Sequence, residues 1–138
     1  MMSPKAIVEK MMAKDAFSQG LNIEILEIKA GFCLAKMKVT QEMVNGFEIA
    51  HGGISYSLSD STLAFAANAH GTQCVSIETS ISHTLPAKIG DVLTAKCTEI
   101  HRGKTIGVYQ VKVTNQFSDT VAIFKGTVHI SNRKWENN

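Results

Sequence analysis

The sequence carries little charge and no concentration of positive charge. Charged residues make up 19% of the 138 residues, the net charge is +2, and no basic run is longer than Arg133-Lys134. A nucleic-acid-binding domain normally presents a basic patch, so a nucleic-acid partner is not expected. The least charged region, residues 49–87, still contains Asp60, Glu78 and many Ser and Thr residues, which excludes a membrane span there.

Cysteine is scarce. Cys33, Cys74 and Cys97 are an odd number without a CxxC motif, and the first ten residues do not resemble a secretory signal. We therefore expect a cytoplasmic protein whose thiols are reduced and occupy small core positions. The histidines lack spacings such as HExxH, so no metal site is expected.

One stretch of the chain has almost no charge at all. Between Ala50 and His70 there is no Lys, Arg or Glu, and Asp60 is the only formal charge. A helix that is apolar on nearly every side is a buried helix, and this one is expected to end near His70-Gly71. Burying an ionised carboxylate without partners costs several kcal/mol, so the presence of Asp60 requires an explanation.

The remaining pattern is mostly β. We expect one domain over residues 1–138, with a short N-terminal helix within residues 1–18 that starts at Ser3-Pro4. From Leu21 to Val39 apolar and polar residues alternate as in a β-hairpin. Further strands are expected at 74–85, 92–102, 105–116 and 120–131, joined as an antiparallel meander and followed by a frayed tail at 132–138.

This order of elements predicts an α+β fold. A curved antiparallel sheet of six strands would wrap around one long central helix, because a buried helix requires cover on all sides.

Six short motifs occur in a fixed order within residues 21–131. They are Asn45-Gly46, His51-Gly52-Gly53, Ser57-Leu58-Ser59-Asp60, Pro86-Ala87, Arg102-Gly103-Lys104 with Gly107-Val108-Tyr109, and Val121 to Gly126. This combination resembles the hotdog fold, and within it the acyl-coenzyme A thioesterases of the phenylacetate-pathway type. The resemblance implies hydrolysis of acyl- or arylacyl-CoA, with phenylacetyl or hydroxyphenylacetyl groups among the candidates. Coenzyme A is then part of the substrate, and no cofactor is expected.

The residues themselves indicate where the chemistry lies. Gly52 and Gly53 begin the central helix, where free backbone N–H groups and the helix dipole suit an anion; alternatively they only permit a tight entry into the helix. Asp60 follows eight residues later, about 12 Å along the helix axis. A carboxylate that acts on a carbonyl at Gly52 must approach to about 3 to 4 Å. One chain therefore does not supply both groups, and we expect a homodimer with shared sites.

The resemblance implies a role for each of five catalytic candidates. The Gly52 N–H would hold the thioester carbonyl with Asn45 as a second donor, and His51 would orient Asn45 or interact with the leaving thiolate. Asp60 would act as nucleophile or as general base, with Ser76 positioning a water. Two alternatives stay open: Asp60 is a structural carboxylate bonded to Ser or Thr, and Ser76 is an ordinary strand residue turned away from the site.

Coenzyme A and the acyl group must also be bound, and cations with free N–H groups in turns can contact phosphates, although exposed lysines in turns usually contact only solvent. The candidates are Gly53, Thr62, Leu63, Ser82, His83, Thr84, Lys88, Arg102, Gly103 and Lys104. Dimers of this type are expected to pair into homotetramers. Two other functions are considered: a non-catalytic acyl-CoA binding or sensing domain, which would not need Asp60, and an enoyl-thioester hydratase, whose catalytic His with an acid has no counterpart in this pattern.

Overall fold

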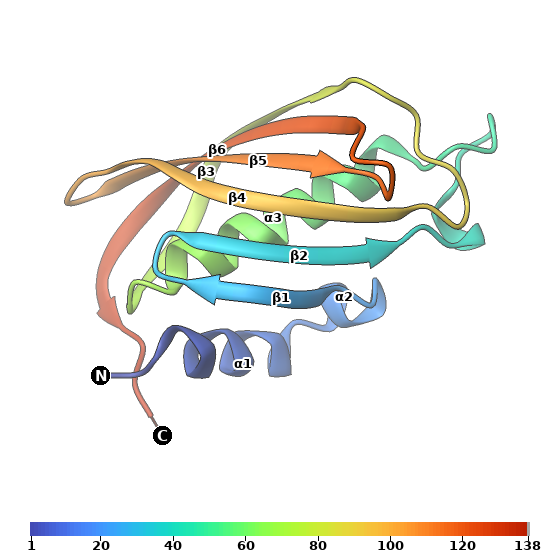
Figure 1. Cartoon of the computed structure of the whole chain (residues 1–138). Helices are drawn as coiled ribbons and strands as arrows, with labels where there is room; N and C mark the ends of the chain where they lie inside the picture. The colour runs from blue at the N-terminus through green and yellow to red at the C-terminus, as the bar shows by residue number, and fades with distance from the viewer. Residues whose placement is uncertain (138) are drawn as a thin grey trace.

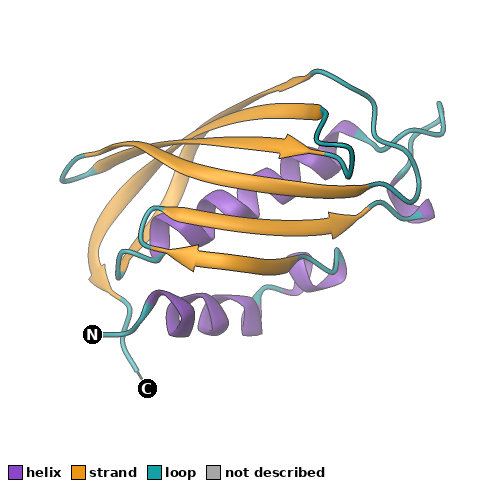
Figure 2. Cartoon of the chain, in the orientation of Figure 1, coloured by secondary structure: helices purple, strands orange, loops and turns teal. Residues whose placement is uncertain are grey.

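A curved six-stranded antiparallel sheet wraps around one long helix in the computed structural model, which describes residues 1–137 (Figures 1 and 2). This confirms the expected α+β architecture. The elements are α1 (Pro4–Lys14), α2 (Ala16–Gly20), β1 (Glu24–Lys29), β2 (Phe32–Lys38), η1 (Gln41–Met43), α3 (Gly52–Asn68), β3 (Thr72–His83), β4 (Val92–Arg102), β5 (Ile106–Thr114) and β6 (Thr120–Lys134).

The N-terminal segment forms two helices where one was predicted. The Ser3 hydroxyl accepts from the Ala6 N–H at 3.1 Å and caps α1, as expected. Asp15 ends α1 in a non-helical conformation, and its carboxylate then caps α2 by accepting from the Ser18 N–H at 2.9 Å. The first strand begins at Glu24 and not at Leu21, because Leu21 caps α2 and Asn22 has a positive φ of 55°.

The prediction of a simple meander was wrong. The strand order is β1-β2-β4-β5-β6-β3, so β4, β5 and β6 form a meander, but β3 pairs with β6 at one edge of the sheet. Helix α3 carries the chain from β2, which lies between β1 and β4, to β3 at the far edge of the sheet, and β4 then returns to pair with β2. Because of this long connection, β2 and β3 follow each other in sequence but are not neighbours in the sheet.

Helix α3 lies against the concave face of the sheet, where the core is found (Figure 1). It contacts β2, β3, β4, β5 and β6 as well as α1. The three thiols are buried and free, as expected, and burial raises the pKa of Cys33 to about 12. In the described residues, no helix has the length and apolar character needed to cross a membrane.

The C-terminal segment is more ordered than predicted over its described part. Strand β6 continues to Lys134, whose partner is Thr72 at the start of β3. Trp135 donates its indole N–H to the Asn68 Oδ1 at 2.9 Å and its backbone N–H to the Gly71 carbonyl at 2.9 Å. These bonds attach the segment to the end of α3. The predicted frayed tail was therefore wrong for residues 132–135, and residue 138 lies outside the described residues.

Candidate active site

The first turn of α3 presents a free backbone donor at Gly52. His51 is the N-cap, and its Nδ1 atom accepts from the Gly53 N–H at 2.9 Å. The Ile54 N–H donates to the His51 carbonyl at 2.8 Å. Within residues 1–137 the Gly52 N–H has no acceptor. Of the two predicted glycine donors, only Gly52 is thus left for a ligand, at the positive end of a 17-residue helix.

A cavity of about 320 Å³ opens at Gly52. Asn45, Ser55, His83 and Thr84 supply its other polar side chains, and its apolar lining is Ile49, Ala50, Leu85, Pro86, Ala87 and Val121. The cavity thus brings together four of the predicted residues, which come from the 40–50 connector, from α3 and from the end of β3.

Asn45 is held in a defined orientation beside this cavity. Its Oδ1 atom accepts from the Phe47 N–H at 2.9 Å, and its backbone N–H donates to the Ile49 carbonyl at 2.8 Å. With the amide oxygen used in this turn, the amide NH₂ group is available to a ligand. Asn45 and Gly52 therefore offer two donors to one cavity.

His83 lies directly against Gly52. A Cβ atom on Gly52 would be 3.1 Å from the His83 Nε2 atom. The opposite ring nitrogen, Nδ1, is 3.3 Å from the Ser55 Oγ atom, which is also 3.3 Å from the Gly52 carbonyl oxygen. Ser55 was not among the predicted site residues, although its position three residues after Gly52 on one helix places both on the same face.

Asp60 lies on α3 but does not line the Gly52 cavity. Its side chain is half-buried, and in the described chain it forms no ion pair. Burial raises the pKa of Asp60, and a hydrogen bond with the Ser76 side chain partly opposes this rise. Asp60 and Gly52 lie eight residues apart on the same helix, which corresponds to about 12 Å of helical rise.

The side chain of Ser76 is close to Asp60. A β-bulge between Ser76 and Glu78 shifts the pairing of β3 with β6, and this irregularity changes which side chains face α3. Ser76 also lines a second cavity, of about 440 Å³, with Leu63, Cys74 and Trp135 among its neighbours. Asp60 and Ser76 thus lie together, outside the Gly52 cavity.

Thr62 and Leu63 belong to the core of the subunit. Thr62 is 0% exposed, and its hydroxyl donates to the Leu58 carbonyl at 2.6 Å. Leu63 is 1% exposed and packs tightly against Gly126. Neither residue lines the Gly52 cavity, so within this chain neither contacts a group bound there.

The predicted basic residues do not line the Gly52 cavity. Lys88 is exposed, and its backbone N–H donates to Asp91 at 2.8 Å. Arg102, Gly103 and Lys104 line a cavity of about 610 Å³ together with Thr72, Thr105, His129, Ile130, Ser131, Asn132 and Lys134. This cavity, the basic cavity below, gathers Arg102, Lys104 and Lys134 at the turn between β4 and β5.

Arg102 is bound within a polar network that the sequence did not reveal. Its guanidinium donates to the Tyr109 hydroxyl at 3.3 Å, and that hydroxyl donates to Glu99 at 2.6 Å. His70 also contacts the same Glu99 oxygen at 2.7 Å. Burial raises the pKa of Glu99, but the hydrogen bonds from Tyr109 and His70 more than offset this, and the pKa lies below its ordinary value. The network fixes Arg102 at the rim of the basic cavity.

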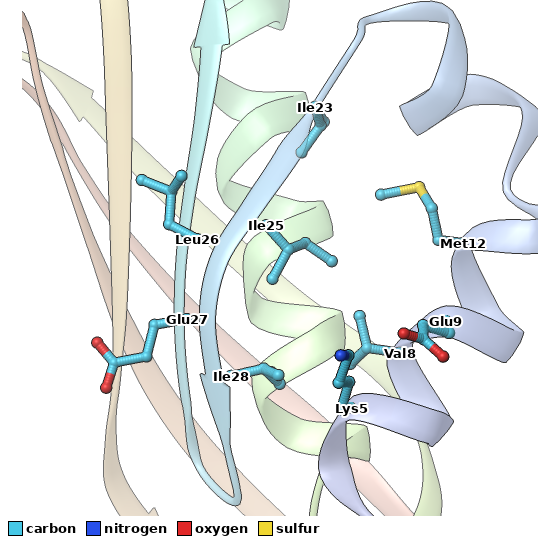
Figure 3. Close-up of a pocket in the computed structure, with 9 residues that line it drawn as sticks. All are labelled: Lys5, Val8, Glu9, Met12, Ile23, Ile25, Leu26, Glu27 and Ile28. Atoms are coloured by element: carbon cyan, nitrogen blue, oxygen red, sulfur yellow. The ribbon is translucent and has the colours of Figure 1, made fainter.

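A further cavity, of about 380 Å³, lies between α1 and β1 and is shown in Figure 3. Val8 and Met12 of α1 face Ile25 and Ile28 of β1 across it. Its charged lining residues are Lys5 and Glu9 of α1 and Glu27 of β1, whose carboxylate points away from α1 in Figure 3. None of the predicted site residues lines it, so it is not a candidate for the chemistry at Gly52.

A helix wrapped by a curved six-stranded antiparallel sheet, with a free N–H at the helix start, defines a hotdog-fold protein. The model of the thioesterase superfamily matches residues 47–122, which is more than half of the chain. The chain belongs to the thioesterase superfamily.

Three relatives illustrate this membership. The acyl-coenzyme A thioesterase PaaI of Escherichia coli K12 is 39% identical over 119 residues, 86% of this chain and 85% of PaaI. The PaaI structure matches with a TM-score of 0.93 over 95% of both chains, at 35% identity. Human acyl-coenzyme A thioesterase 13 is 28% identical over 134 residues, which are 94% of this chain and 96% of the human protein. A hypothetical thioesterase of Streptococcus pneumoniae, solved with coenzyme A, matches with a TM-score of 0.85 at 29% identity over 91% of this chain and 98% of its own.

Proposed function

We propose that this protein hydrolyses acyl-CoA thioesters to the free acid and coenzyme A. One observation carries the proposal: the unpaired Gly52 N–H opens with Asn45 into a single cavity at the positive end of α3. The relatives named as acyl-coenzyme A thioesterases support the same chemistry. The raised pKa of the Asp60 carboxyl supports a group able to take up a proton.

The carbonyl oxygen of the thioester would accept from the Gly52 N–H and from the Asn45 amide. As water adds to the carbonyl carbon, negative charge develops on this oxygen, and both donors and the helix dipole stabilise it. Removing one such donor typically costs about a hundredfold to a thousandfold in rate. The Gly52 donor belongs to the backbone and does not depend on a side-chain conformation.

Asp60 would activate the attacking group. As a base it takes a proton from water, whose oxygen bonds to the carbonyl carbon; as a nucleophile it forms an anhydride that water then opens. Single turnover in ¹⁸O-labelled water, with enzyme in excess, separates the two routes. A base places the label in the released acid, whereas a nucleophile places it first in the Asp60 carboxyl group.

The active site would be shared between two protomers. Asp60 lies beside β3, an edge strand that exposes Val75 at 65% and Ile77 at 57%. An exposed apolar edge strand supports pairing with a second copy of the same strand. An antiparallel pairing of two β3 strands would bring Asp60 of one protomer toward Gly52 of its partner. We further propose that such dimers pair into a tetramer, which sedimentation equilibrium tests.

The basic cavity would hold the phosphate groups of coenzyme A. Arg102, Lys104 and Lys134 supply cations there, and the Tyr109 hydroxyl restrains Arg102. In the proposed dimer, the start of β3 beside this cavity would lie near the partner's His83. One protomer would then bind the thioester, and its partner would supply Asp60 and the phosphate contacts.

The test is release of free thiol from a panel of acyl-CoA thioesters that includes phenylacetyl-CoA. Wild type is expected to turn over at least one of them, and Asp60→Ala is expected to lose at least about a hundredfold in kcat. Binding of the thioester by wild type without any turnover would favour an acyl-CoA binding domain and contradict the proposal.

Mixing two inactive variants tests the shared site. Gly52→Val protein and Asp60→Ala protein would each be inactive, but a hybrid dimer would contain one intact site. Random mixing should restore roughly a quarter of the wild-type rate, because half of the dimers are hybrids with one working site each. A fully active monomer, or no recovery in dimers shown to be hybrid, would contradict sharing.

A further inference from the structure

Two histidines flank Gly52, and they differ in their contacts. The Nδ1 atom of His51 accepts from the Gly53 N–H at 2.9 Å, and His51 does not line the Gly52 cavity. His83 does line that cavity, and its Nε2 atom is 3.1 Å from the position that a Cβ atom on Gly52 would occupy. The imidazole that faces a group bound at Gly52 is therefore that of His83.

Ser55 controls which nitrogen of His83 carries the proton. The Ser55 hydroxyl is 3.3 Å from Nδ1 of His83. The Ser55 hydroxyl donates to the Gly52 carbonyl oxygen at 3.3 Å, so its oxygen accepts from the Nδ1–H of His83. The protonated ring carries its second proton on Nε2, which is the nitrogen beside Gly52. Ser55 is 5% exposed, so water does not easily replace this partner. The buried hydroxyl thus prepares His83 as a proton donor toward the cavity.

We propose that His83 is the general acid that protonates the leaving sulfur of the thioester held at Gly52. This inference rests on the proposed function and adds a residue to it. The carbon–oxygen bond forms from water, whose proton goes to Asp60, and the carbon–sulfur bond breaks with its electron pair remaining on sulfur. The sulfur takes the Nε2 proton of the His83 imidazolium, the neutral ring keeps its Nδ1 proton beside Ser55, and Nε2 regains a proton from solvent.

The position of His83 fits this role. A carbonyl oxygen bonded to the Gly52 N–H places the adjacent sulfur within the same cavity, which His83 and Thr84 line at the end of β3. An alkyl thiol has a pKa of about 8.5, so a sulfur that leaves at neutral pH gains from a proton donor. Positioned general acids contribute about a hundredfold to ten-thousandfold.

Leaving-group dependence separates acid catalysis from a purely structural role. The variant His83→Phe keeps a ring against Gly52 but has no proton to give. We would compare kcat for phenylacetyl-CoA with kcat for phenylacetyl thiophenol ester, whose acidic aryl thiol leaves without protonation. We expect a loss of about a hundredfold with phenylacetyl-CoA and less than about threefold with the aryl ester. Ser55→Ala should show the same selectivity to a smaller extent.

Asp60→Asn is the matched control, because a lost base slows both substrates alike. Circular dichroism and thermal unfolding would establish that His83→Phe is folded. Equal losses of kcat on both substrates in folded His83→Phe, or a rise in KM with kcat unchanged, would overturn the role of His83 and leave the proposed hydrolysis intact. Failure of wild type on every acyl-CoA and on the aryl ester would instead remove the proposed function itself.

Discussion

The Nε2 atom of His83 lies 3.1 Å from the place where a side chain on Gly52 would begin, so the imidazole occupies the space that glycine leaves open. The two residues come from the end of β3 and the start of α3, and they border one cavity. Any substitution at Gly52 must move His83.

The first prediction concerns Gly52→Ala. The higher helix propensity of alanine, worth up to about 1 kcal/mol, opposes the cost of the close contact with His83. The free energy of unfolding should therefore change little. The displaced His83 and the altered donor should nevertheless lower kcat at least tenfold, because small misplacements of reacting groups are costly. Gly20→Ala is the control, since a Cβ atom there meets nothing within 4 Å. A Gly52→Ala enzyme with wild-type kcat would contradict this prediction.

The second prediction concerns Asp60→Asn. Because burial raises the pKa of Asp60 in the folded protein, ionising it weakens the fold as pH rises above its ordinary value of 3.8. Asn should therefore raise Tm at neutral pH while lowering kcat at least about a hundredfold. The gain in Tm should disappear as pH falls toward 3.8, where wild-type Asp60 is itself protonated. A lower Tm for Asp60→Asn at neutral pH would contradict the desolvation argument.

The third prediction concerns Tyr109→Phe. The variant removes the hydroxyl that bonds Glu99 and Arg102 within a partly buried network, which should cost about 1 kcal/mol of unfolding free energy. The lowered pKa of Glu99 makes its contribution to stability present above 4.5 and lost as pH falls below it. Urea unfolding from neutral to acidic pH should therefore show a flatter pH dependence in Tyr109→Phe. An unchanged slope would mean that the hydroxyl does not hold Glu99 ionised.

The fourth prediction concerns Gly126→Ala. A Cβ atom on Gly126 would overlap the Leu63 side chain inside the core. Overpacking of this kind typically costs about 1 to 3 kcal/mol, so Tm should fall. Shortening the neighbour in the double variant Gly126→Ala, Leu63→Val should recover part of the loss relative to Leu63→Val alone. Additive losses in this double-mutant cycle would show that the two positions are not in contact.

Local patterns were sufficient to predict much of the fold. The uncharged run that contains Asp60 predicted α3, and the bounds of β4 were predicted without error. Glycines before an apolar helix also indicated the free donor at Gly52. The strand order was not predictable in this way, because the pairing of β3 with β6 depends on contacts between distant residues.

Irregular strands explain what the sequence did not reveal about the site. A bulge between Glu99 and His101 shifts the alternation of β4, so that Arg102 turns toward Tyr109 while His101 is exposed. The bulge beside Ser76 acts similarly on β3. Strict two-residue alternation assigns the wrong faces after such an insertion. His83 was predicted as a candidate for binding coenzyme A or the acyl group, but its approach to Gly52 was visible only in the folded structure.

The pairing of Thr72 with Lys134 has a consequence for synthesis of the chain. A ribosome completes β3 well before the 15 residues of β6 exist, so the nascent β3 strand has no partner on either side. During that interval both hydrogen-bonding edges of β3 are open to other chains, whereas in the complete fold β6 covers one of them. Translation that stops before β6 would release a polypeptide whose exposed strand promotes aggregation, which makes completion of the last strand the step that protects the nascent protein.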